Sequence, residues 1–166
     1  MKNDSKIVIL VTGGTFDKEY NEITGKLFFN DSHIREMLDL GRCKLEVDIK
    51  KLMLKDSLDM KKIDRKLILD TCLKTTASKL VITHGTDTMS ETAELLSKNI
   101  RNKTIVFTGA MIPYKFGASD GLFNLGSALT AVQTLNNGIY IAINGNIFKW
   151  DLVKKNRKKG IFELIS

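Results

Sequence analysis

The chain has 166 residues, of which 43% are hydrophobic and 27% charged, with a single proline and a net charge of +7. This length suits one domain with an apolar core, and the composition excludes disordered, collagen-like and low-complexity proteins. The longest apolar run, Ile7–Val11, is far shorter than the roughly 20 residues of a membrane-spanning helix and too short for a signal peptide.

Short runs rich in isoleucine and valine predict five strands: Ile7–Val11, Leu45–Ile49, Leu80–Thr83, Ile105–Thr108 and Ile139–Ile143. Four of these runs are continuously apolar, as expected of strands that are covered on both faces. The run at 45–49 alternates apolar and acidic residues, so one of its faces is expected to be wet.

Helical patterns lie between the predicted strands. One helix follows Ser32, a second follows Asp59, a third begins with a capping box at Thr88–Glu91, and a fourth opens at Asp120. Strand and helix alternate without a repeat or a flexible linker. We therefore expect residues 1–166 to form a single α/β domain, a three-layer α/β/α sandwich with a mainly parallel sheet.

Two cysteines, Cys43 and Cys72, fall in core-like segments and are interpreted as free thiols in a reducing cytoplasm. With only two histidines beside them, at unrelated spacings, no structural zinc site is plausible. The sequence predicts neither a metal nor a cofactor.

Basic residues gather between Lys149 and Lys159. This run is a solvated segment in one interpretation and a nucleic-acid surface in another, although it lacks interleaved aromatic residues and any RNA- or DNA-binding motif. In a third interpretation, one lysine of the run belongs to an active site and the others are incidental.

Ligands of parallel sheets bind beyond the carboxyl ends of the strands, so the loops that follow the strands are the expected place of function. The stretch Phe16–Phe29 has no helical period and is long for a connection, as lids often are. Hydroxyl, carboxylate and amine groups occur in the loops after the strands: Thr12–Thr15, Asp56–Leu58, His84–Asp87, Gly109–Gly121 and Asn144–Lys154.

Several familiar site motifs are missing. The chain has no Gly-Lys-Ser/Thr phosphate cradle and no G-x-S-x-G elbow, and a G-x-G-x-x-G fingerprint fails after Gly14. A hydroxyl group activated by a lysine remains possible, and Thr86, Asp87 and a strand-end lysine could form such a set.

The segments Thr12–Thr15 and His84–Met89 resemble the two signature segments of the bacterial-type L-asparaginase family. Three further segments match: Asp56–Met60, Gly109–Met111 leading to Ser119–Gly121 and Asn124, and Asp151–Lys154. The resemblance covers essentially the whole chain, but only the N-terminal domain of the family. The smaller C-terminal domain of the usual two-domain enzymes is therefore expected to be absent.

The resemblance implies an amidohydrolase that releases ammonia from L-asparagine or a related amide. It makes Thr15 the nucleophile and Tyr20 the loop tyrosine that activates it. Thr86, Asp87 and Lys154 match the family's second catalytic set, which promotes proton transfer.

Ser57 and Asp87 match the residues that grip the substrate's α-carboxylate and α-ammonium groups, and Gly14 and Leu58 complete the expected substrate-binding set. Leu58 stands where many two-domain relatives have a glutamine, which weakens the case for L-asparagine itself.

Two other functions stay open. One is a binding or regulatory domain that retains the same pocket without efficient turnover, and the other is a nucleotide-binding oxidoreductase. The expected partner is a small amino-acid amide, with no nucleic acid and no membrane. A homodimer or homotetramer is expected, joined through an apolar patch at Phe28, Phe29, Ile112 and Tyr114.

Overall fold

A computed structural model describes residues 6–165 of the chain, and its centre is a six-stranded sheet in the order β4-β1-β5-β6-β7-β8. The strands are β1 (Ile7–Gly13), β4 (Val47–Lys55), β5 (Lys79–Thr83), β6 (Thr104–Thr108), β7 (Gly138–Ile143) and β8 (Asn146–Lys149). All neighbours from β4 to β7 are parallel, and β8 runs antiparallel to β7.

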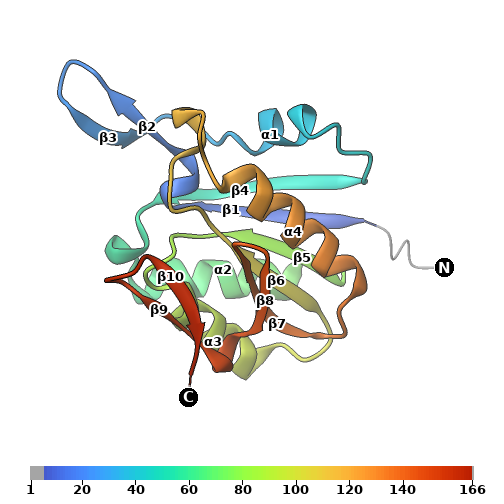
Figure 1. The fold of residues 1–166 in the computed structure, drawn as a ribbon. Coiled ribbons are helices and arrows are strands. Elements are labelled where there is room, and N and C mark those ends of the chain that lie inside the picture. Colours follow the sequence, from blue (N-terminus) through green and yellow to red (C-terminus); the bar gives the residue numbers. More distant parts are fainter. Residues whose placement is uncertain (1–5, 166) are drawn as a thin grey trace.

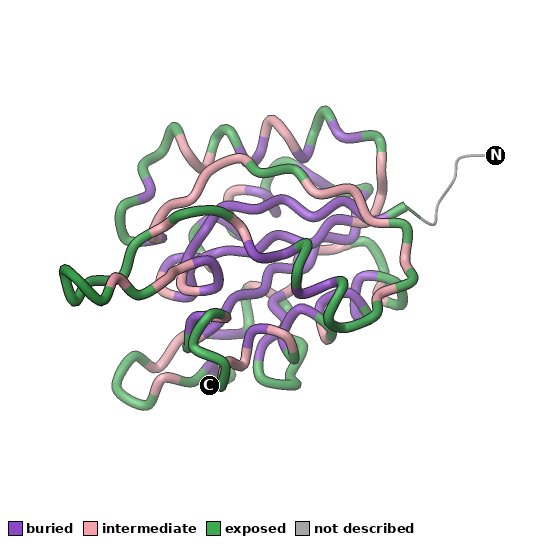
Figure 2. Tube along the Cα trace, turned by 90° about the horizontal axis from the view of Figure 1, so that it is seen from above, coloured by how far each residue is buried: buried purple, intermediate pink, exposed green. Residues whose placement is uncertain are grey.

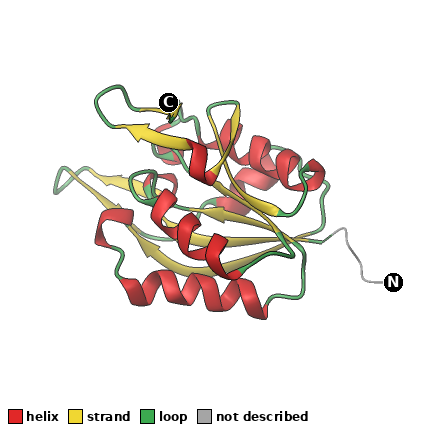
Figure 3. Cartoon of the chain, turned by 90° about the horizontal axis from the view of Figure 1, so that it is seen from below, coloured by secondary structure: helices red, strands yellow, loops and turns green. Residues whose placement is uncertain are grey.

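Four helices cover the two faces of this sheet: α1 (Ile34–Leu40), α2 (Lys62–Lys74), α3 (Met89–Asn99) and α4 (Gly121–Thr134). Side chains alternate along β1, so that Val8 and Leu10 pack with α2 and α3 while Ile7, Ile9 and Val11 pack with α1 and α4. Figure 3 shows helices on both sides of the strands. The predicted three-layer α/β/α sandwich is confirmed.

The predicted strand at 45–49 and the predicted start of the second helix differ from the structure. The strand expected at 45–49 is β4, which runs from Val47 to Lys55 and has no buried residue, because it is an edge strand. Helix α2 begins at Lys62 rather than after Asp59, which lies in the 3-10 turn η2 (Ser57–Asp59).

The predicted capping box of α3 does not form. Thr88 does occupy the N-cap position, but its hydroxyl donates to the carbonyl of Ser57 at 2.9 Å instead of serving the helix. Glu91 pairs with Arg65 of α2 at 3.0 Å. The side chains of Thr88 and Glu91 thus bond to neighbouring elements instead of to the backbone at the start of α3.

Two hairpins extend from the carboxyl end of the sheet (Figure 1): β2 (Lys18–Asn21) with β3 (Lys26–Phe29), and β9 (Val153–Asn156) with β10 (Ile161–Leu164). The tip of the β2–β3 hairpin is exposed (Figure 2), whereas Val153 and Phe162 of the other hairpin are buried in the core. None of the helices within residues 6–165 is long and apolar enough to cross a membrane.

Candidate functional site

The candidate site lies where the crossover direction of the sheet reverses. From β1 the chain crosses to β4 at one edge, and from β4 it returns to β5 on the other side of β1. Ligands of parallel sheets bind at such a reversal, beyond the carboxyl ends of the two strands. The loops after β1 and β5 are therefore in the expected position.

Three strand-end loops touch at this point through contacts that only glycine allows. A Cβ atom on Gly14, whose φ is +80°, would lie 2.5 Å from the nitrogen of Gly85. A Cβ atom on Gly85 would lie 2.6 Å from Oγ of Ser57. Thr15 and Thr86, which follow these glycines directly, are thus held beside the same contact. The structure gives Gly14 a packing role at the place where substrate binding was predicted.

A hydrogen-bonded cluster of Thr86, Asp87 and Lys155 lies at this end of the sheet. The Nζ atom of Lys155 donates to Oγ1 of Thr86 at 2.7 Å and to Oδ1 of Asp87 at 2.9 Å. Thr86 is buried, and the Lys155 side chain is only 14% exposed. These three groups make a charged, hydrogen-bonded and largely enclosed cluster.

The lysine of this cluster is Lys155, so the prediction of Lys154 is wrong by one position. Successive side chains of a strand point to opposite sides. Val153 faces the core, and Lys155, two residues further along β9, shares its side, whereas Lys154 is exposed. In the sequence, the apolar Val153 indicates which side of the strand is buried. Counting alternate residues from Val153 could therefore have selected Lys155 over Lys154.

Two further cations reach the carboxylates of the site, and sequence reasoning missed both. Nε of Arg157, in the turn of the β9–β10 hairpin, lies 3.4 Å from Oδ1 of Asp87. Lys18 of β2 donates to Oδ2 of Asp56 at 2.5 Å. Partial burial acts to raise the pKa of Asp56, but the hydrogen bonds from Lys18 and the Leu58 amide and the charges of Lys18 and Lys155 outweigh it, so the pKa lies below its usual value.

Ser57 and Leu58, both predicted to bind substrate, differ in their surroundings. Ser57 is 1% exposed, and its hydroxyl has no hydrogen-bond partner within the described part of the chain. Leu58 is 61% exposed, and its amide donates to Asp56. The Ser57 hydroxyl is thus buried against Gly85, whereas the Leu58 side chain lies at the surface.

Tyr20 lies apart from the Thr86–Lys155 cluster. It is 54% exposed on β2, opposite Leu27, and lines an open surface hollow with Lys115 and Phe116. The loop expected at Phe16–Phe29 is therefore a 3-10 turn, η1 (Thr15–Asp17), followed by a hairpin that presents Tyr20 to solvent.

His84 and Asp120 have structural roles. Nδ1 of His84 lies 2.9 Å from the carbonyl of Gly85, to which it must donate, so Nε2 accepts from the Thr92 hydroxyl at 2.8 Å. Burial lowers the pKa of His84 to about 4, which keeps the ring neutral. The Asp120 carboxylate accepts from the amide of Met111 at 3.0 Å and fixes the loop after β6.

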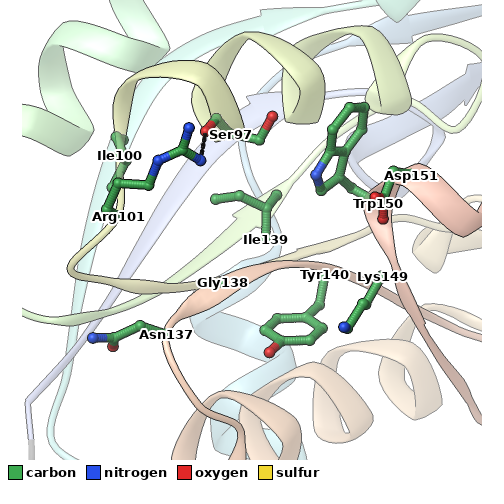
Figure 4. Close-up of a pocket in the computed structure, with 10 residues that line it drawn as sticks. All are labelled: Ser97, Ile100, Arg101, Asn137, Gly138, Ile139, Tyr140, Lys149, Trp150 and Asp151. Atoms are coloured by element: carbon green, nitrogen blue, oxygen red, sulfur yellow. Dashed lines mark hydrogen bonds between the residues drawn. The ribbon is translucent and has the colours of Figure 1, made fainter.

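A separate hollow of about 280 Å³ lies where β7 begins and α3 ends, away from these loops (Figure 4). Trp150, Tyr140 and Lys149 face it, and Arg101 at its border donates to the carbonyl of Ser97. No residue of the Thr86–Lys155 cluster lines it. Within residues 6–165, no group of three or more histidine, cysteine or acidic side chains is placed to hold a metal ion.

Residues 6–162 match the family described as "Asparaginase, N-terminal". L-asparaginase 2 of Escherichia coli is 32% identical over 165 residues, an alignment that covers 90% of this chain and 46% of that protein. The chain spans about half or less of the length of the curated relatives that it matches.

Solved structures agree with this match. The thermostable L-asparaginase from Thermococcus kodakarensis superposes with a TM-score of 0.84 at 29% identity, covering 96% of this chain and 51% of its own. A probable cytoplasmic L-asparaginase from Campylobacter jejuni gives a TM-score of 0.76 at 31% identity, covering 91% of this chain and 49% of its own.

Proposed function

The chain belongs to the asparaginase N-terminal family, and from this premise we propose that it is an amidohydrolase that releases ammonia from L-asparagine or a related amide. The observation that carries the proposal is the Lys155 ammonium, which donates to both Thr86 and Asp87 beside the Gly14–Gly85 contact. Hydroxyl, carboxylate and amine groups held together in this way can activate a hydroxyl for amide cleavage without a metal.

In the proposed reaction Thr15 is the nucleophile. Its Oγ attacks the side-chain carbonyl carbon of the substrate, and its proton passes to the departing nitrogen, which leaves as ammonia. Water then attacks the acyl-enzyme, releases the acid and returns a proton to Thr15. The contact between Gly14 and Gly85 supports Thr15 as the nucleophile, because it holds the loop of Thr15 beside the loop of Thr86.

Thr86, Asp87 and Lys155 handle the protons of both steps. Lys155 fixes the direction of the Thr86 hydroxyl by donating to its oxygen at 2.7 Å, and Asp87 holds the ammonium at 2.9 Å. The Thr86 hydroxyl itself donates to Sδ of Met111 at 3.8 Å, a weak bond that it would exchange for one to the reacting groups when a substrate is bound. Backbone N–H groups at Thr86 and at the start of α3 would stabilise the oxyanion.

Ammonia release from L-asparagine, D-asparagine, L-glutamine and small amides tests the proposal. Thr15→Ala and Thr86→Val should each lower turnover by about 100-fold or more with the fold intact, because groups that act as a unit fail together. Thr130→Ala, which removes an exposed hydroxyl on α4, is the control and should change nothing. Binding of amides without ammonia release would instead favour a non-catalytic binding domain.

We further propose that residues 1–166 act as one catalytic domain in the cytoplasm and assemble as a homodimer or homotetramer. Two apolar clusters on either side of one sheet support a single domain, and the similar Campylobacter jejuni structure, described as a probable cytoplasmic L-asparaginase, supports the compartment. Exposed Phe28 and Ile112 support self-association, although Tyr114 packs on His33 with ring centroids 5.9 Å apart. A pure monomer in sedimentation at micromolar concentration, still fully active, would contradict the assembly.

A further inference from the structure

Asp17 is the only acidic side chain within residues 6–165 that is buried, and none of its surface is exposed. Burial raises its pKa more than the hydrogen bond from the His33 amide lowers it. Its Oδ2 atom has no hydrogen-bond partner in the described part of the chain. A buried carboxyl group with an unpaired oxygen costs free energy of folding, so its place points to a use other than stability.

Asp17 ends the turn that carries the proposed nucleophile. Turn η1 consists of Thr15, Phe16 and Asp17, and the amide of Asp17 donates to the carbonyl of Gly14 at 3.2 Å. Phe16 and Asp17 are both 0% exposed, whereas Thr15 is half-buried. Two of the three side chains of the turn are therefore fixed in the interior, and Thr15 is the one that a substrate can reach.

The Asp17 carboxylate also closes the base of the β2–β3 hairpin. Its Oδ1 atom accepts the amide hydrogen of His33 at 2.9 Å, and His33 is the N-cap residue of α1. The whole hairpin, Lys18–Phe29, lies between these two residues in the chain. One hydrogen bond thus joins the turn of Thr15 to the start of the helix that follows the hairpin.

Contacts on both sides of Asp17 hold the same base. Nε2 of His33 lies 3.2 Å from Oε1 of Glu19 in β2. Lys18, the residue after Asp17, donates to Oδ2 of Asp56 at 2.5 Å. Beyond these contacts the hairpin is exposed, and segments with few buried contacts open at little free-energy cost. The hairpin can therefore move about this base while turn η1 stays in place.

We propose that Asp17 is a positioning residue: it holds the turn of Thr15 against the start of α1, so that the nucleophile keeps its place while the hairpin moves. The inference rests on the proposed amidohydrolase function, because alignment matters only if Thr15 attacks a substrate. A displacement of about 1 Å at a reacting group can cost about 100-fold in rate. Asp17 acts through turn η1 and not by contact with the substrate.

Asp17→Ala removes the acceptor of the His33 amide, whereas Asp17→Asn keeps a carbonyl oxygen that can accept its hydrogen. In ammonia-release assays of the full chain, Asp17→Ala should lower kcat at least tenfold and change KM less than threefold, because the groups that bind the substrate stay in place. Asp17→Asn should restore kcat to within threefold of the parent. A residue that only stabilised the fold would leave kcat per folded molecule unchanged.

Asp31→Ala is the matched control, since it removes a carboxylate that is 66% exposed, pairs with Lys51 and lies two residues before His33. It should leave kcat and KM within twofold of the parent. A smaller than tenfold loss in folded Asp17→Ala, or no recovery in Asp17→Asn, would overturn the proposal.

Asp17→Glu takes the place of Asp17→Ala if the alanine variant does not fold. It keeps the charge but displaces the carboxylate by one methylene, so kcat should fall while Asp17→Asn stays active. An Asp17→Glu variant as active as Asp17→Asn would likewise overturn the proposal.

Hydrogen exchange followed by mass spectrometry separates this inference from the proposed activity. In Asp17→Ala or Asp17→Glu, the amides of residues 15–18 and of His33 should exchange at least tenfold faster than in the parent, with the β9–β10 hairpin unchanged. If the parent releases no ammonia from any amide but exchange increases in this way, the amidohydrolase function fails and the link between η1 and α1 stands. Unchanged exchange at His33 would overturn the link whatever the activity.

Discussion

The two hairpins at the carboxyl end of the sheet are attached to the body in different ways. The β9–β10 hairpin buries Val153 and Phe162 in the core, and the amide of Ile165, just after it, bonds to the carbonyl of Leu152. The β2–β3 hairpin leaves Tyr20 and Leu27 about half exposed. The β9–β10 hairpin thus packs into the core, whereas the β2–β3 hairpin projects from it with an exposed tip.

The two hairpins are therefore expected to differ in how easily they move. Elements with few buried apolar contacts open at little free-energy cost, whereas those built into the core open only with the whole fold. The anchored hairpin therefore holds Lys155 in a fixed place, and the exposed hairpin can move Tyr20 without disturbing it. Three substitutions test this contrast, and they are given in descending order of their expected effect.

Lys155→Met should lower turnover about 1,000-fold, because it removes the ammonium that orients Thr86 and leaves Asp87 facing only Arg157. Lys154→Met removes the same charge from the exposed side of the same strand and should leave turnover within twofold of the parent. Steady-state ammonia release measures both variants. A larger loss with Lys154→Met would mean that β9 has the opposite phase in the working protein.

Phe162→Ala should lower the free energy of unfolding by about 3 kcal/mol, since the side chain is only 9% exposed and packs in the core. Phe28→Ala, on the exposed hairpin, should cost less than about 1 kcal/mol. Urea denaturation followed by circular dichroism gives both values. Equal losses would show that the two hairpins are equally anchored.

Tyr20→Phe should reduce kcat about tenfold and leave KM nearly unchanged, because an exposed hydroxyl can act only after the hairpin closes over a substrate. Tyr140→Phe is the control, since its hydroxyl bonds to the carbonyl of Asn136 away from the site. A rate for Tyr20→Phe equal to that of the parent would assign the activating role to another residue or to water.

The sheet could be predicted because its strands are buried. Four of the five apolar runs lie within strands that are buried along most of their length. A continuous apolar run predicts a strand that is covered on both faces, so these strands could be found from the sequence. Strands β2 and β9 were missed since the sequences Lys18–Asn21 and Val153–Asn156 are mostly polar. Pairing with a neighbouring strand, rather than an apolar pattern, forms them.

The site could be predicted only as far as its side chains sit on rigid strand ends. Thr86 and Asp87 follow a buried strand and lie together as the sequence indicated. Lys154 and Lys155 are adjacent and identical, so only the phase of β9 selects between them. Arg157 reaches Asp87 through the shape of a hairpin turn, which no local pattern of residues specifies.

The contact between Gly14 and Gly85 has a consequence for how this protein can change. In an apolar core, a larger side chain can be accommodated when its neighbour becomes smaller, so pairs of substitutions can exchange volume. Two glycines that touch through their backbones have no volume to exchange. Neither residue can be replaced by a larger one unless the backbone of one of the two loops changes its path. We therefore expect these two glycines to stay unchanged while the residues of the two hairpins vary.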